Sequence, residues 1–159
     1  MDADAVEIRV LGCMIEKQRT TPDLYPLTLN ALRAACNQTT NRDPVVSYDE
    51  ETIRAALHRL SRRQWARVAS GPGSRAVKHR QLLGEALDLT DDELAILCVL
   101  MLRGAQTAGE LKARTDRMQS FGSLTEVQES LDGLIRRELV ARIARRPGHG
   151  RALKQLVSL

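Results

Sequence analysis

The chain contains one stretch of sequence twice, and this internal repeat constrains its architecture more than any other feature. The copies align at offsets of 74, then 75, then 76 residues, so single-residue insertions separate the matching blocks. The matching blocks are 57–65 with 131–139, 67–69 with 142–144, and 75–78 with 151–154. This spacing is too long for a solenoid repeat and suits two copies of a small domain. The sequence therefore predicts two domains, residues 1–84 and residues 85–159.

Hydrophobic periodicity predicts three helices and a β-hairpin in the first copy. Pro26 favours a helix start at about Leu27, because proline is common at the first helical position. Ser47 followed by Glu50 matches a capping box, which marks the start of a third helix. The predicted helices are 3–17, 27–37 and 47–63, and the predicted strands are 66–70 and 77–82.

The second copy predicts the same order of elements. Thr90 and Glu93 match a capping box before an apolar segment that reaches about Arg103, and Ser123 with Glu126 marks another helix start. The predicted helices begin at Thr90, Thr107 and Ser123, and the predicted strands lie near 140–145 and 151–157. Three helices followed by a hairpin form the winged helix, a helix-turn-helix variant. We therefore expect an α+β, mostly α protein of two tandem winged-helix domains, each with three helices and a β-hairpin wing.

A long motif in the first copy adds a family resemblance. Its segments are EKQ at 16–18, TTPD at 20–23, YPLTLNAL at 25–32, ACNQ at 35–38 and NRDPV at 41–45. Together they resemble the YceH family of bacterial proteins, which is known mainly as a domain of unknown function. The resemblance implies two winged-helix domains, and longer members with a charged tail beyond the position of Leu159, but it implies no activity. Thr39 and Thr40 stand where the family pattern has Lys-Ser, which removes one positive charge.

The excess of positive charge lies in the first copy. The net charge is +4. Residues 1–84 hold 13 Lys and Arg against 9 Asp and Glu, whereas residues 85–159 hold 11 of each kind. A basic balance of this kind is compatible with nucleic-acid binding but does not establish it.

The cysteines and the apolar segments indicate where the protein works. Cys13, Cys36 and Cys98 show no paired spacing, which favours buried thiols in a reducing compartment. The acidic first residues do not resemble a signal peptide, and the longest apolar run, 94–102, is too short to span a membrane. We expect a soluble cytoplasmic protein without a membrane partner.

The predicted wings and the first copy's third helix carry the residues that would contact DNA. Basic side chains on a glycine-containing hairpin suit contact with phosphates, and the third helix normally enters the major groove. The candidates are Arg54, His58 and Arg62 on the helix, Arg75, Lys78 and Arg80 in the first wing, and Arg145, Arg146, Arg151 and Lys154 in the second wing. The first hypothesis is therefore a DNA-binding, transcription-regulator-like protein with double-stranded DNA as its partner. An arginine at a helix end, such as Arg62, has the alternative role of stabilising the helix dipole.

Acidic residues at the starts of the third helices favour a different function. Asp49, Glu50 and Glu51 begin one such helix, and Glu126 and Glu129 lie on the other. Carboxylates stabilise a helix N-terminus, but they repel phosphates. The second hypothesis is a protein–protein interaction module in a bacterial chromosome-associated or regulatory complex, without direct DNA contact. A homodimer is compatible with both hypotheses, although no long heptad pattern predicts one.

A polar loop connects the second and third predicted helices. It contains Asn37, Gln38, Asn41, Arg42 and Asp43 and is long for such a connection. Its amide and guanidinium groups suit a phosphate, a peptide backbone or a partner carboxylate. The alternative is that they bond the loop's own backbone and hold the turn before Pro44.

No residue pattern predicts catalysis, a metal site or a cofactor. His58, His79 and His149 lie in different elements without the spacing of metal ligands. The paired carboxylates occur only at helix starts, where capping explains them. We find no combination of nucleophile, base and orienting group, and we therefore expect a protein that acts by binding rather than as an enzyme.

Overall fold

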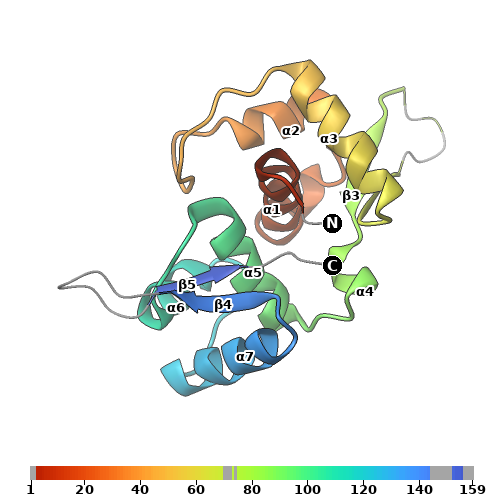
Figure 1. Ribbon diagram of the computed structural model, residues 1–159. Coiled ribbons are helices and arrows are strands. Elements are labelled where there is room, and N and C mark those ends of the chain that lie inside the picture. The colour runs from red at the N-terminus through yellow and green to blue at the C-terminus, as the bar shows by residue number, and fades with distance from the viewer. Residues whose placement is uncertain (1–2, 70–72, 74, 144–151, 156–159) are drawn as a thin grey trace.

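The computed structural model describes residues 3–69, 73, 75–143 and 152–155, with the side chains of 152–155 outside that description. Within these residues the protein is mostly helical, with seven α-helices and two small antiparallel sheets (Figure 1). The α+β, mostly α class is therefore confirmed. None of the described helices is long and apolar enough to cross a membrane.

The first half of the chain combines three α-helices with a three-stranded sheet. In chain order it contains α1 (Ala5–Thr20), the 3₁₀ helix η1 (Pro22–Leu24), β1 (Leu27–Thr28), α2 (Leu29–Cys36), α3 (Glu50–Arg62), β2 (Ala66–Val68) and β3 (Lys78–Gln81). β3 is the central strand, where His79 lies opposite Leu27 of β1 and opposite Val68 of β2. The sheet therefore ties the start of α2 to the β2–β3 hairpin.

The second half repeats the order of three helices and two strands after the short helix α4, and its described residues form no 3₁₀ helix or strand that corresponds to η1 and β1. It contains α4 (Leu83–Ala86), α5 (Asp91–Arg103), α6 (Ala108–Thr115), α7 (Leu124–Arg136), β4 (Val140–Ile143) and β5 (Ala152–Gln155). β4 and β5 are antiparallel, with Val140 opposite Gln155 and Ile143 opposite Ala152. The boundary expected after residue 84 falls within α4, and the division into two domains stays a prediction.

The predicted start of α2 at about Leu27, signalled by Pro26, is wrong. Leu27 and Thr28 form the short strand β1, and α2 begins only at Leu29. The Thr28 hydroxyl accepts a hydrogen bond from the Ala31 backbone N–H at 3.1 Å, so Thr28 is the N-cap. Pairing with β3 holds these two residues in an extended conformation that overrides the local helix signal.

The predicted cap of α3 is also wrong, whereas the caps of the second half are confirmed. α3 begins directly after Asp49, whose carboxylate accepts a hydrogen bond from the Thr52 N–H at 2.8 Å, so Ser47 lies before the helix. Thr90 forms the predicted capping box of α5, and Ser123 caps α7. An Asp at the N-cap accepts hydrogen bonds from the same exposed N–H groups as a Ser does. Ser47 and Asp49 were therefore alternative N-caps for this helix.

The centre of the molecule is the contact between α1 and α5 (Figure 1). The two helices approach closely at Gly12, where a Cβ atom would lie 2.8 Å from Leu102 Cδ2 and 3.2 Å from Met101 Cβ. At the same point the Cys98 thiol donates a hydrogen bond to the Gly12 carbonyl oxygen at 3.3 Å. Both helices are apolar on most faces, so one cluster of buried side chains runs through both halves.

Ion pairs hold the end of α3 against the start of α1. Arg63 Nε donates to Glu7 at 2.8 Å, and Arg59 contacts both Glu7 at 3.4 Å and Asp4 at 2.9 Å. The Arg63 guanidinium also lies over the Trp65 ring, 5.1 Å from its centroid. Because Glu7 is almost fully buried, these contacts fix the position of α3 on the body of the protein.

Candidate nucleic-acid interface

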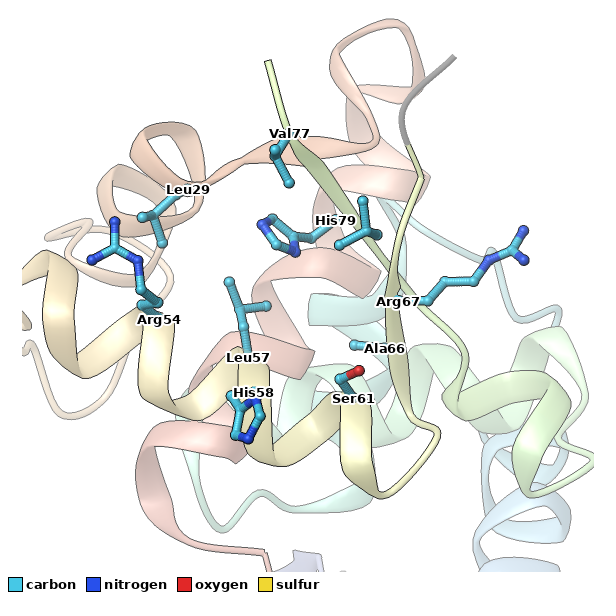
Figure 2. Close-up of a pocket in the computed structure, with 10 residues that line it drawn as sticks. Leu29, Arg54, Leu57, His58, Ser61, Ala66, Arg67, Val77 and His79 are labelled. Atoms are coloured by element: carbon cyan, nitrogen blue, oxygen red, sulfur yellow. The ribbon is translucent and has the colours of Figure 1, made fainter. Parts of the chain in front are cut away.

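A groove of about 410 Å³ lies between α3 and the β2–β3 hairpin (Figure 2). Its lining combines apolar and basic side chains from α2, α3 and the two strands. The lining residues are Leu29, Arg54, Leu57, His58, Ser61, Ala66, Arg67, Val68, Val77 and His79. Two of the predicted DNA-contacting residues, Arg54 and His58, are therefore brought to one surface with the hairpin.

The amphipathic pattern of α3 explains which of its residues face outward. Ile53, Leu57 and Leu60 point into the core, which leaves Arg54, His58 and Arg62 exposed as predicted. Residues three and four apart lie on the same face of a helix. Consequently the three candidate side chains form one outward row along α3.

Arg54 is not an isolated cation. It contacts Glu50 at 3.0 Å and Glu51 at 3.4 Å, both one turn earlier on α3, and all three side chains are exposed. Exposed pairs of this kind contribute only about 0–1 kcal/mol, because water screens them. The guanidinium can therefore exchange its carboxylate partners for a phosphate at little cost, but the carboxylates remain beside it and oppose an approaching anion.

The hairpin exposes a different set of cations from the one predicted. Arg75 is exposed, whereas Lys78 and Arg80 are partly buried on β3, with Arg80 3.8 Å from Glu85. Arg67 on β2 is exposed beside the groove and was absent from the predicted set. The outward position of Arg67 next to the buried Ala66 follows from strand alternation, which was the signal that could have identified it.

His79 is a neutral polar group within the groove near pH 7. Burial lowers the pKa of its imidazole, because a partly desolvated ring disfavours the charged form. Figure 2 shows this ring between Val77 and Leu57, with Arg54 and Arg67 at opposite edges. The middle of the groove is thus apolar and uncharged, while its rim is basic.

The third helix of the second half, α7, differs from α3 at two of the candidate DNA-contacting positions. The repeat places Gln128 at the position of Arg54 and Asp132 at that of His58. Asp132 also contacts Arg142 at 3.1 Å, and both side chains are half exposed. Arg145, Arg146 and Arg151 of the predicted second wing lie outside the described residues, and of Lys154 only the position on β5 is described.

Within the polar loop, Arg42 binds the protein itself. Its guanidinium donates to both carboxylate oxygens of Glu16, at 2.8 and 3.1 Å, and Nε donates to the Ala35 carbonyl oxygen at 3.0 Å. Arg42 and Glu16 are both buried. Burial opposes ionisation of Glu16, but the hydrogen bonds and charge of Arg42, helped by Lys17, keep the pKa of Glu16 below its ordinary value.

The other polar residues of this loop also bond within the chain. The Asn37 side chain makes two hydrogen bonds with the backbone of Tyr48. It accepts one from the Tyr48 N–H at 2.8 Å and donates one to the Tyr48 carbonyl oxygen at 2.9 Å. Gln38 accepts a hydrogen bond from Lys17, and Asn41 accepts one from Arg103. The Asp43 backbone N–H donates to the Leu102 carbonyl oxygen at 2.9 Å. These contacts favour the interpretation in which the loop's polar groups hold its own fold.

The three cysteines are buried and free, as predicted, but two of them meet in the core. Cys13 of α1 and Cys36 of α2 lie close enough for each thiol to influence the pKa of the other, a proximity that their sequence separation does not reveal. The described residues contain no cluster of three or more His, Cys, Asp and Glu side chains placed to hold a metal ion.

Comparison with known proteins identifies relatives along most of the chain. A family model described as "Protein of unknown function, DUF480" matches residues 3–149. A UPF0502 protein of Opitutus terrae is 49% identical over 146 residues, covering 90% of this chain and 64% of that protein. UPF0502 proteins of Citrifermentans bemidjiense and of Klebsiella pneumoniae are 51% and 46% identical, each over 91% of this chain. The chain spans 68% and 70% of those two proteins.

Proposed function

The chain belongs to the DUF480 family of bacterial UPF0502 (YceH) proteins, and we propose that it is a non-enzymatic protein of two tandem winged-helix units that binds double-stranded DNA. The two units correspond to residues 1–84 and 85–159. The repeated order of three helices and a strand pair supports this division. The DNA-binding surface is the groove of the first unit, formed by α3 and the β2–β3 hairpin.

One observation carries the proposal: exposed cations lie on both walls of a single groove. Arg54 of α3 and Arg67 of β2 line the groove, and Arg62 and Arg75 are exposed on the same helix and hairpin. Among the described residues that line the groove, none carries a carboxylate. A third helix in the major groove with the hairpin beside the backbone would bring these cations to phosphates.

Small side chains on α3 support a close approach to DNA. Ala55 and Ser61 are exposed on the same helix as Arg54 and His58, so the helix backbone is not held away from base edges by bulky groups. Arg and His are capable base contacts in the major groove. However, Glu50 and Glu51 lie in the first turn of α3, where they repel phosphates near the bases. They therefore favour binding to the DNA backbone with little sequence selectivity.

A protein partner is the second candidate function. The groove exposes Val68 and Val77, which are 58% and 57% accessible to solvent, and Arg54 is already paired. Apolar surface of this kind suits a protein ligand better than a phosphate backbone. In this alternative the acidic start of α3 is part of the interface rather than an obstacle.

A salt titration of binding to a labelled random-sequence duplex separates the two functions. If all four exposed cations of α3 and the hairpin contact phosphates, log affinity should fall against log salt with a slope of about −3 to −4, at about 0.9 per phosphate. The double variant Arg67→Glu/Arg75→Glu should lose most of this binding while its circular dichroism spectrum stays unchanged. Absence of binding at about 50 mM salt would refute DNA binding and favour a protein partner.

A further inference from the structure

The groove between α3 and the β2–β3 hairpin has the size of a small-molecule site. Sites for small ligands typically measure about 300–1,000 Å³ and have mostly apolar walls with a few polar groups. The groove holds about 410 Å³ and has both features. Contact with a DNA backbone requires exposed cations but no such cavity, so the hollow itself needs a separate explanation.

Apolar side chains form the floor and the hairpin wall of this groove. Leu29 and Leu57 contribute from the helices, and Val68 and Val77 contribute from the two sides of the hairpin. The two valines remain more than half exposed although they face a hollow surface. An apolar ligand lying between the helices and the hairpin would remove this surface from water, which is favourable.

The polar groups around the floor of the groove favour a ligand with a negative charge. Arg54 and Arg67 stand at opposite edges, and the neutral His79 ring lies between them (Figure 2). A neutral imidazole can donate one hydrogen bond to an anion without adding charge. No described lining residue carries a carboxylate, so the negative charge closest to a bound anion is that of Glu50 and Glu51 beside Arg54.

We propose that this groove binds a small organic anion with an apolar body, such as an aromatic carboxylate or sulfonate. The body lies on Leu57, Val68 and Val77, and the acid group pairs with Arg54. Arg54 then exchanges its contacts with Glu50 and Glu51, which are exposed and weak. The ligand competes with DNA because both use α3 and the hairpin, and this competition rests on the proposed DNA binding.

The test uses 1-anilinonaphthalene-8-sulfonate as the apolar anion and its fluorescence as the readout. Val77→Asp places a negative charge inside the groove, and we expect it to weaken binding about tenfold or more through like-charge repulsion. Val45→Asp is the matched control, because Val45 is equally exposed at 56% but does not line the groove. It should leave binding within about twofold of wild type, as surface substitutions away from a site do.

Two further measurements separate this proposal from the proposed function. The neutral analogue N-phenyl-1-naphthylamine lacks the sulfonate, so it should bind more weakly and should not respond to Arg54→Gln. Unlabelled duplex should displace the anion from wild-type protein. Urea unfolding of each variant verifies that the fold is retained.

Each outcome has a distinct meaning. Equal binding of the anion by Val77→Asp and Val45→Asp would overturn the groove site. Duplex that binds without displacing the anion would overturn the competition. If Val77→Asp weakens anion binding, Val45→Asp does not, and the wild-type protein binds no duplex, then the anion site is supported and the proposed DNA function is refuted.

Discussion

Arg42 is predicted to be the most important charged residue for stability, because its guanidinium is fully buried. Its exposed fraction is 0%, and that of its partner Glu16 is 2%. Besides both Glu16 oxygens, it donates to the backbone carbonyl oxygens of Ala35 and Asn41, at 3.0 and 2.8 Å. One side chain therefore ties α1, α2 and the polar loop together.

Substitution of Arg42 by Met keeps the length of the side chain and removes its charge and donors. Removal of one partner from a buried ion pair costs about 3–5 kcal/mol. Lys17 and Arg117 still contact Glu16, each at 3.3 Å, so we expect a loss near the lower limit, about 3 kcal/mol. With a urea dependence of about 2 kcal/mol per molar, the unfolding midpoint should fall by about 1.5 M.

The loss should depend on pH in a defined direction. In the wild type, Arg42 holds the pKa of Glu16 below its ordinary value of 4.5. A carboxyl whose pKa is lower in the folded state stabilises the fold above its unfolded pKa, and this contribution disappears as the pH falls through the folded pKa. In Arg42→Met, protonation of Glu16 instead relieves a buried charge that has lost its main partner but keeps Lys17 and Arg117. The difference between the two proteins should therefore be largest near pH 7 and shrink below about pH 4.5.

Urea unfolding followed by circular dichroism at pH 7 and at pH 4 measures both effects. Arg19→Met is the matched control, because Arg19 also pairs with a carboxylate, Asp91 at 2.7 Å, but the pair is solvent exposed. Its midpoint should change by less than about 0.5 M. A midpoint shift for Arg42→Met no larger than that for Arg19→Met, or a loss of stability that grows as the pH falls, would contradict this prediction.

Three further substitutions test the packing and the caps. Gly12→Ala should destabilise by about 1–2 kcal/mol despite the better helix propensity of Ala, because the new Cβ meets Leu102 at 2.8 Å; a raised urea midpoint would contradict this. Asn37→Ala removes both hydrogen bonds to the Tyr48 backbone and should speed amide hydrogen exchange in the following loop. Unchanged protection would show that these two bonds do not hold the loop. Thr90→Ala should cost about 1 kcal/mol, seen as a lower melting temperature, and no change would show that the cap is dispensable.

The elements that sequence predicts well are those whose signals are local. Thr90 and Ser123 mark helix starts correctly, and α5 ends at Arg103 as expected, because capping and amphipathic spacing act within a few residues. The internal repeat predicts the order of helices and strands in the second half of the chain from their order in the first half. These signals do not depend on which part of the chain packs against which.

Long-range contacts account for the errors. A two-residue strand at Leu27–Thr28 has no periodicity, and only its pairing with β3 makes it a strand. Likewise, the meeting of Cys13 with Cys36 depends on how α1 and α2 pack, and the burial of Arg42 depends on Glu16, 26 residues away. A polar residue in a loop therefore looks like a binding group until its buried partner is known.

The candidate interface was predicted in part for the same reason. Arg54, His58 and Arg62 follow from the helical pattern, and Arg75 follows from the predicted wing. The predicted wing also includes Lys78 and Arg80, but the sheet partly buries both on β3. The register between β2 and β3 determines which hairpin residues face the groove. The sequence of the hairpin alone does not determine that register.

The most direct test of DNA binding by the first unit compares two residues that the repeat itself pairs. Arg67 on β2 and Arg142 on β4 occupy matching positions, and both are exposed, but only Arg67 lies beside the groove. Fluorescence anisotropy of a labelled duplex at low salt would be measured with Arg67→Glu and with Arg142→Glu. DNA binding through α3 and the β2–β3 hairpin predicts a loss of about tenfold or more for Arg67→Glu and little change for Arg142→Glu. Equal affinities for the two variants would contradict it.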